Sequence, residues 1–165
     1  MSSDQSVTIR PATADEDFDA IAQLYLTVWR SAYAGMIPAA TLAALTPKLW
    51  RPAERWQLTH LAVTATDQVV GVIAAGPARR SQWAGQTEIY SLYVLPGFQH
   101  QQIGSRLMQA ALADLSSADV VNLLVLAKNQ AARRFYDRIG FHDTGQHLVD
   151  TMPDGTKLIN QIYRL

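Results

Sequence analysis

The sequence predicts an α/β (α+β) fold in which helices cover the faces of a mixed sheet. Two observations support this prediction. Segments with the two-residue period of strands alternate with segments whose apolar residues recur at helical spacing. One run, VVNLLVLA at residues 120–127, is almost continuously apolar, as expected of a strand that is covered on both sides. The predicted order of elements is β, α, α, β, β, β, α, β, α, β, β.

The N-terminal third is predicted to hold one strand and two helices. A short strand is expected at residues 7–10, VTIR. Residues 13–33 predict a helix with Thr13 as its N-cap, because acidic residues fill the first turn and apolar side chains follow at helical spacing. Those apolar positions are Phe18, Ile21, Leu24 or Tyr25, and Val28. Residues 39–45 follow Pro38 and are rich in helix formers, so a second, shorter helix is expected there.

The middle of the chain changes to the period of strands. Residues 61–66 and 69–76 are rich in β-branched side chains and flank a turn at Asp67 and Gln68, which predicts an antiparallel hairpin. A further strand is expected at residues 88–95, EIYSLYVL. Three consecutive strands are therefore predicted in this region.

The last third of the chain is predicted to contain two helices and the three remaining strands. One helix begins near Gly104 and is followed by the apolar strand already described. Asn129 is a favourable N-cap and Gly140 a favourable end for the next helix. The final strands are expected at 141–149 and 158–165, joined through the turn residues Pro-Asp-Gly.

Size and composition narrow the functional classes. With 165 residues and a mass of 18.2 kDa, the chain is expected to form one domain over residues 1–165. The 14 Lys and Arg residues balance 14 Asp and Glu residues, so no charge surplus predicts binding to nucleic acid or to an anionic membrane surface. No apolar run approaches the length of a membrane span, and the N-terminus has no secretory pattern.

Cysteine and histidine usage limits the chemistry. Cysteine is absent, which excludes disulfides and a thiol nucleophile within this sequence and fits a cytoplasmic protein. The histidines show no spacing typical of metal ligands, so no metal is expected. They are His60, His100, His142 and His147.

The stretch FQHQQIGSRLM at residues 98–108 is predicted to be a turn from a strand into a helix. Such a turn presents free backbone N–H groups and the positive end of the helix dipole to whatever lies in front of it. These are the features of an anion-binding site, and phosphate is the ligand that we expect there.

Two segments together resemble the GNAT superfamily of N-acetyltransferases. The first is YVLPGFQHQQIGSRLM, and the second, NQAARRFYDRIGF, follows about twenty-five residues later. The resemblance covers residues 61–145 and implies a mostly antiparallel central sheet of six to seven strands with helices on both faces. It also implies acetyl-CoA as co-substrate and an amine as the acceptor.

The family pattern at the first segment places Gln99 on its first position and Gly104 on its last. Gln102 falls where the family usually has glycine, which is a departure from the pattern. We expect the N–H groups of residues 101–105 to bind the diphosphate of coenzyme A while the Gln102 side chain points away, with a negative φ at Gln102. The residues expected to bind the coenzyme are Leu92, Tyr93, Val94, Gln99, Gln101, Gln102, Ile103, Gly104, Ser105, Asn129, Ala132 and Tyr136.

The second segment supplies a candidate general acid. Asn129, Ala132, Arg133 and Tyr136 recur at i, i+3, i+4 and i+7, on one face of a helix. By resemblance, Asn129 contacts the pantetheine arm or its neighbouring backbone, and Tyr136 donates a proton to the departing thiolate. Two alternatives remain open: Asn129 as a helix cap alone, and Tyr136 as a core aromatic residue.

The strand at 88–95 supplies a candidate general base. Strict alternation places Glu88, Tyr90, Leu92 and Val94 on one face and Ile89, Ser91, Tyr93 and Leu95 on the other. Glu88 is the only carboxylate in this strand, and similar family members use Glu at this position to deprotonate the amine, directly or through a water. The alternative is a solvent-facing residue at the start of a strand. By the same resemblance, Trp29 and Tyr33 border the acceptor pocket.

The leading hypothesis is direct acetyl transfer in a ternary complex to a small molecule or a protein amino group. A non-catalytic acyl-CoA-binding module is the alternative, and Gln102 is its main support. A third possibility, an interaction domain that binds no coenzyme A, requires both segments to be coincidental. Monomer and homodimer both remain open.

Overall fold

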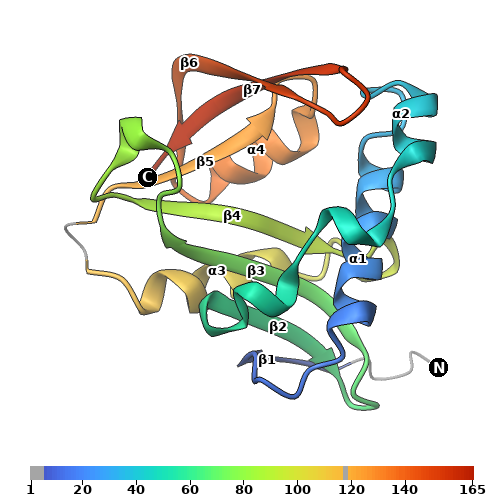
Figure 1. Cartoon of the computed structure of the whole chain (residues 1–165). Helices are drawn as coiled ribbons and strands as arrows, with labels where there is room; N and C mark the ends of the chain where they lie inside the picture. Colours follow the sequence, from blue (N-terminus) through green and yellow to red (C-terminus); the bar gives the residue numbers. More distant parts are fainter. Residues whose placement is uncertain (1–5, 117–118) are drawn as a thin grey trace.

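The computed structural model describes residues 6–116 and 119–165, and its elements follow the predicted order (Figure 1). The helices are α1 Phe18–Ala32, α2 Ala39–Ala44, α3 Ile103–Ala113 and α4 Gln130–Arg138. The strands are β1 Val7–Pro11, β2 Thr59–Thr64, β3 Val69–Pro77, β4 Thr87–Val94, β5 Val121–Leu126, β6 His142–Thr151 and β7 Lys157–Arg164. Short 3₁₀ turns lie at Pro47–Leu49, Pro52–Glu54, Trp56–Leu58, Ser81–Trp83 and Pro96–Phe98.

The strands form one seven-stranded sheet in the order β1-β2-β3-β4-β5-β7-β6. Every neighbouring pair is antiparallel except β4 and β5, which are parallel. The predicted hairpin over β2 and β3 and the predicted mostly antiparallel sheet are therefore confirmed.

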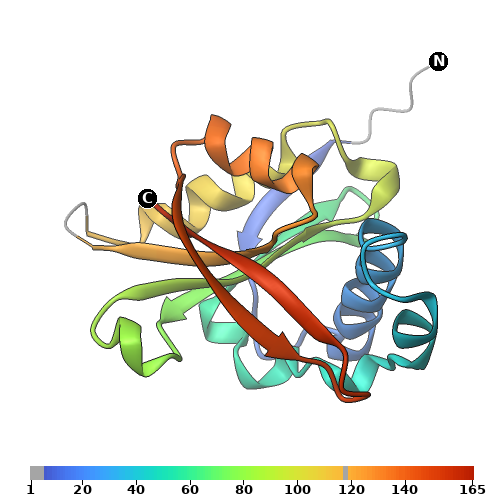
Figure 2. The ribbon, with the colours of Figure 1, turned by 90° about the horizontal axis from the view of Figure 1, so that it is seen from above.

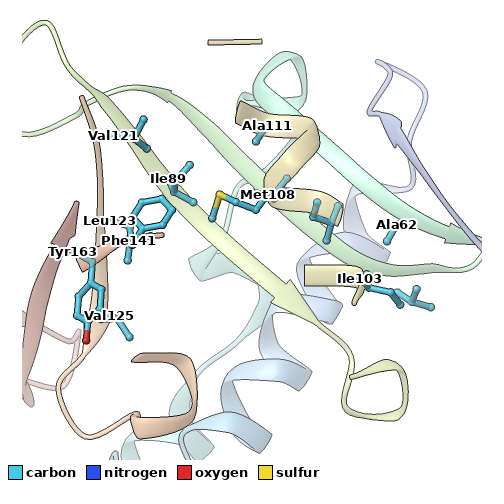
Figure 3. Packing of buried hydrophobic residues seen from close by; sticks show 13 residues of the cluster. Ala62, Ile89, Ile103, Met108, Ala111, Val121, Leu123, Val125, Phe141 and Tyr163 are labelled. Carbon is cyan, nitrogen blue, oxygen red and sulfur yellow. The ribbon is translucent and has the colours of Figure 1, made fainter. Parts of the chain in front are cut away.

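Helices cover both faces of this sheet (Figure 2). Helix α3 packs on β2, β3 and β4, and α4 lies on the same side, whereas α1 and α2 cover the other side. Gly71 of β3 allows α3 to pack closely on the sheet, because a Cβ atom there would lie within 3.3 Å of the Leu107 and Ile103 side chains. Figure 3 shows this core, in which Met108 of α3 lies beside Ile89 of β4.

The start of α1 differs from the prediction. Asp17, not Thr13, is the N-cap, and its side chain accepts a hydrogen bond from the Ala20 N–H at 3.0 Å. Thr13 instead donates its N–H to Glu16 Oε2 at 2.8 Å, and Glu16 is paired with Arg10 at 2.7 Å. The acidic segment is therefore a turn tied to β1, and the helix begins only where that turn ends.

A β-bulge in β4 overturns the predicted alternation of its side chains. Ser91 pairs with Ala74 and Ile89 pairs with Ala75, so Tyr90 is an extra residue opposite β3. Because a bulge shifts the pattern by one residue, Ile89 packs with the core under α3, although alternation had placed it on the face of Ser91. Tyr93 packs on the α1 side, as the alternation beyond the bulge requires.

The two central strands separate soon after they pair. β4 and β5 are paired only over Thr87–Ile89 and Val121–Leu123. The remainder of each strand diverges, and this opens the sheet at its middle. None of the helices described here, over residues 6–116 and 119–165, combines the length and hydropathy that a membrane crossing requires.

Candidate active site

A cavity of about 160 Å³ lies where β4 and β5 separate. Its walls come from these two strands, from α4 on one face of the sheet and from α1 on the other, so it connects the two faces. The lining residues are Val28, Ala32, Tyr33, Ile89, Tyr90, Ser91, Leu92, Tyr93, Val94, Gln99, Leu123, Leu124, Val125, Asn129, Ala132 and Tyr136. Several residues predicted to bind the coenzyme therefore line one cavity: Leu92, Tyr93, Val94, Gln99, Asn129, Ala132 and Tyr136.

A larger cavity, of about 600 Å³, lies at the other end of β3 and β4, beside the end of α3. None of the site residues predicted from the sequence lines it. The smaller cavity is therefore the better candidate for the active site, despite its size.

Four of the tyrosines that the structure describes line the candidate cavity, and burial acts most strongly on the hydroxyls of three of them, Tyr33, Tyr93 and Tyr136. Burial raises the pKa of Tyr33 to about 12, and the nearby Tyr136 adds to this shift. Burial, with a smaller contribution from neighbouring tyrosines, also holds the pKa of Tyr93 and of Tyr136 well above the usual tyrosine value. All three phenols therefore keep their protons at neutral pH. Among the described residues no carboxylate lines this cavity.

Tyr136 lines the cavity and also packs against other aromatic rings. Its ring packs edge to face against Phe135 and Phe141 at 5.2 and 5.9 Å between centroids, which places the residue in the aromatic core. Its hydroxyl nevertheless has no hydrogen-bond partner within residues 6–116 and 119–165 and is not a buried unsatisfied group. The ring therefore packs as a core residue, as one alternative expected, while a role of the hydroxyl as proton donor remains a prediction.

Asn129 and Arg133, which were predicted to share one face of α4 with Tyr136, differ in their contacts: one lines the cavity and the other does not. Asn129 caps α4 by accepting a hydrogen bond from the Ala132 N–H at 3.2 Å, and it also lines the cavity. Arg133 does not line the cavity, because its guanidinium binds the Tyr163 hydroxyl at 3.0 Å and Asp143 at 3.1 Å. The capping role of Asn129 is thus confirmed, and a contact with ligand remains a prediction.

The two aromatic residues predicted at the acceptor side also differ in position. Tyr33 lines the cavity. Trp29 lies behind it, where its indole N–H donates to the Tyr93 hydroxyl at 3.0 Å and its ring meets the Tyr33 ring edge to face at 4.8 Å. Trp29 therefore holds two cavity tyrosines in place.

The strand-to-helix turn before α3 has the free donors expected of an anion site. No side chain caps α3, and the backbone N–H groups of residues 101–105 have no acceptor in the part of the chain that the structure describes. Gln99 ties this turn to the cavity, since its side-chain amide donates to the Val94 carbonyl at 3.2 Å. The remaining residues predicted at this turn do not line the cavity. Gln101 precedes α3, Gln102 is its N-cap residue, and Ile103, Gly104 and Ser105 form its first turn.

The backbone at Gln102 is left-handed, with φ of 62°, so the expected negative φ is wrong. The turn takes the conformation that glycine adopts most easily, although a side chain occupies the position. Gly104 allows a close contact: a Cβ atom there would lie 3.3 Å from the Phe135 ring, so the ring would have to move by a few tenths of an ångström. The glycine lets α4 pack closely against α3.

Glu88 lies outside the cavity lining and is bound to Arg79. Its carboxylate accepts the Arg79 backbone N–H and the Arg79 guanidinium, each at 3.1 Å. Only 3% of Glu88 is exposed, so its interpretation as a solvent-facing residue is wrong. Each oxygen still has a lone pair for a water molecule, because a carboxylate offers about four acceptor positions.

Sequence reasoning missed Ser91 and the β5 side of the cavity. The Ser91 hydroxyl lies 2.8 Å from the Tyr25 hydroxyl, across the interface between β4 and α1. Val28 and Ala32 of α1 stand four residues apart and line the cavity from the other face, a spacing that the helical period could have revealed. The lining residues of β5 are Leu123, Leu124 and Val125. They belong to the nearly continuous apolar run, and an apolar sequence does not distinguish a cavity wall from a filled core.

The sheet is mostly antiparallel and opens between its two parallel strands, and the helix that follows β4 begins with free N–H donors. This arrangement is expected of an acyl-CoA-dependent transferase. The model of the acetyltransferase (GNAT) family matches residues 19–141, and the chain belongs to this family. The protein is an acetyltransferase, with acetyl-CoA as its co-substrate. No group of residues suited to hold a metal ion is found among those that the structure describes.

Named relatives agree with this assignment. A probable N-acetyltransferase of Mycobacterium tuberculosis is 29% identical in an alignment 156 residues long, which covers 90% of this chain and 88% of that protein. The fold is similar to that of the PaiA N-acetyltransferase from Thermoplasma acidophilum in complex with coenzyme A, with a TM-score of 0.71, 21% identity and coverage of 94% and 98% of the two chains. An N-acetyltransferase from Staphylococcus aureus is also similar, with a TM-score of 0.66, 14% identity and coverage of 96% and 100%.

The left-handed backbone at Gln102 predicts that Gln102→Gly stabilises the protein. Removing the side chain relieves about 1–2 kcal/mol of steric cost, while the extra freedom of glycine in the unfolded chain offsets about 0.5–1 kcal/mol. We expect an increase in Tm of roughly 1–4 °C in thermal unfolding, and a coenzyme A affinity within a few-fold of wild type.

Gln101→Gly is the matched control, because Gln101 has no positive φ and is likewise exposed. It is expected to leave Tm unchanged or to lower it. Equal losses of Tm in both variants would contradict the strain at Gln102, and a tenfold gain in coenzyme A affinity on Gln102→Gly would show that the side chain crowds the diphosphate.

Proposed function

We propose that the protein transfers the acetyl group of acetyl-CoA directly to an amine acceptor within a ternary complex. The observation that carries this proposal is the cavity that connects the two faces of the sheet. The free N–H donors before α3 and the residues of α4 serve the coenzyme on one face. The aromatic residues of α1 serve the acceptor on the other, so the two substrates meet in the opening between β4 and β5.

The residues present fit coenzyme A. The N–H groups of residues 101–105 are free to bind the diphosphate, and the positive end of the α3 dipole supports a negative ligand there. Beyond Ile89, the β5-facing edge of β4 has no strand partner, so Leu92, Tyr93 and Val94 would hold the pantetheine arm. Asn129 and Ala132 would hold its other side.

Direct transfer is favoured by the absence of cysteine from the sequence, which leaves no thiol to carry an acyl group. An amine acceptor is supported by the N-acetyltransferase names of the relatives. The acceptor is a small molecule or a protein amino group.

Two residues would move the protons. Tyr136 would donate the proton that the departing thiolate needs, because its hydroxyl is protonated and free in the cavity. Glu88 would accept the proton of the acceptor ammonium through water, since it lies outside the cavity lining. Arg79 occupies one position on each Glu88 oxygen and leaves others free.

Initial-rate kinetics test the ternary complex. With both substrates varied, double-reciprocal plots should intersect, and isotopically labelled acetyl-CoA should leave no label on the protein without an acceptor. Acetyl-CoA at about 100 times its Kd should stabilise the fold by roughly 2.7 kcal/mol, with ATP giving less. Parallel kinetic lines together with a labelled protein would contradict direct transfer, and no stabilisation by millimolar acetyl-CoA would contradict the proposed site.

Tyr136→Phe tests the general acid. The substitution keeps the ring and its packing but removes the proton, so kcat is expected to fall by about 10²–10⁴ while the Kd for coenzyme A stays near wild type. Tyr163→Phe is the matched control, because it removes another buried hydroxyl, bonded to Arg133 and outside the cavity lining. It should lower Tm and leave kcat nearly unchanged. A kcat of Tyr136→Phe equal to that of the wild type would show that Tyr136 is not the general acid and has a purely structural role.

Glu88→Gln tests the general base. The amide keeps the shape of the side chain and removes its basicity, so kcat/KM near neutral pH should fall by about 10²–10⁴. The loss should shrink as pH rises, because more of the acceptor amine is then already neutral. Asp150→Asn is the control, since Asp150 pairs with Arg80, the neighbour of Arg79. A loss of less than about threefold with an unchanged pH profile would identify Glu88 as a structural partner of Arg79.

A further inference from the structure

Arg55 lies between two 3₁₀ turns, Pro52–Glu54 and Trp56–Leu58, where it is held between aromatic rings. Its guanidinium carbon lies 5.8 Å from the Tyr25 ring centroid and 5.8 Å from the Tyr90 ring centroid. Nη2 also lies 3.4 Å from the Tyr25 hydroxyl. Contacts of a cation with two rings hold the half-buried side chain in one place and leave most of its N–H donors free.

The charge of Arg55 is not neutralised by the protein. Within residues 6–116 and 119–165, its side chain has neither a carboxylate nor a carbonyl oxygen as acceptor. The nearby arginines differ in this respect. Their ion pairs are Arg51 with Glu54, Arg79 with Glu88, and Arg80 with Asp150. A fixed, half-buried guanidinium without an anion is a site prepared for one.

The position of Arg55 connects it to the active-site cavity. Tyr90, on which Arg55 stacks, lines that cavity. Tyr25, its other ring partner, is bonded to Ser91, which also lines it. Arg55 therefore contacts a residue of the cavity wall without lining the cavity itself. Its contact with Tyr25, which packs on the α1 side, places Arg55 on that side of the sheet. On the proposed function, this is the side from which the acceptor enters.

The charges around Tyr90 favour an anionic group on the acceptor. Two guanidinium groups flank this ring, Arg55 at 5.8 Å and Arg79 at 4.5 Å from its centroid. Among the described residues, Glu88 is the one carboxylate bound to either of them. The pair of Arg79 and Glu88 is neutral, so the charge of Arg55 remains. A polycationic acceptor would be repelled, whereas a carboxylate matches the planar fork of guanidinium N–H groups.

We propose that Arg55 binds a carboxylate of the acceptor, so that the acceptor is a small amine that also bears a carboxylate, of the amino acid class. This inference rests on the proposed function, because it assigns the acceptor of the same site. The acceptor amine would reach the cavity between β4 and β5 while its carboxylate remains at Arg55, outside the lining.

Matched acceptors test the assignment. A panel of amino acids and their carboxamides would be compared as acceptors with saturating acetyl-CoA. The wild-type protein should acetylate the best carboxylate-bearing acceptor with a kcat/KM at least tenfold above that of its carboxamide, since a site built for a charged group rejects an analogue that lacks it. Arg55→Gln should remove this preference, mainly by raising KM for the carboxylate by tenfold or more, and should leave the carboxamide rate unchanged.

Two variants control this comparison. Arg51→Gln removes a nearby, more exposed arginine that is paired with Glu54, and it should keep the wild-type preference. Arg55→Lys keeps the charge without the planar fork, so it should retain part of the preference. Tm and the Kd for acetyl-CoA of each variant, which should match wild type, separate loss of the carboxylate contact from loss of the fold.

The outcomes distinguish this inference from the function on which it rests. Equal rates on carboxylates and carboxamides, or equal losses on both in Arg55→Gln, would overturn the role of Arg55. So would acetylation of uncharged amines or polyamines alone, or no turnover of any amino acid by a protein that binds acetyl-CoA. In each of these cases acetyl-CoA binding stands. Failure to bind acetyl-CoA would instead contradict the proposed function itself.

Discussion

The site depends on one constraint: β4 and β5 pair over only three residues each and then separate. Parallel strands that stayed paired would fill the middle of the sheet with backbone hydrogen bonds and side chains. The separation leaves an edge of β4 inside the protein, and an unpaired strand edge offers N–H and carbonyl groups to any extended ligand. The bulge at Tyr90 adds to the opening, because it turns Ile89 into the core under α3 and directs Ser91 toward α1.

The start of α3 combines an unfavourable backbone conformation with N–H groups that have no acceptor within the described residues. Gln102 has the left-handed backbone that glycine takes at little cost, and α3 begins with no side-chain cap. Both features are unfavourable for stability, and both leave backbone N–H groups directed away from the protein. Gly104 lies against the Phe135 ring, so the start of α3 is packed against α4.

The chemistry of the cavity follows from what it contains. Its titratable groups are phenols whose protons are retained because burial disfavours the phenolate, and this suits proton donation to a leaving group. Glu88, the candidate base, lies outside the cavity lining and is paired with Arg79. On the proposed function, the acceptor side would hold the neutral pair of Arg79 and Glu88. It would also hold the guanidinium of Arg55, which has no carboxylate partner within residues 6–116 and 119–165. Such a site would differ in its recognition chemistry from an acidic pocket for polycations.

The sequence by itself determined the order of strands and helices, the turn before α3 and the family, because these depend on local periodicity and on residues close together in the chain. It also identified Tyr136, Asn129 and Gln99, which the fold brings to one cavity. It did not determine the bulge at Tyr90, the sign of φ at Gln102, the capping of α1 by Asp17, or the partners of Glu88 and Arg55. Only the tertiary structure decided these, because each depends on contacts with neighbouring segments: the register against β3, the packing of α3 on α4, and the approach of the turns at 52–58 and 77–87 to the same face of β4.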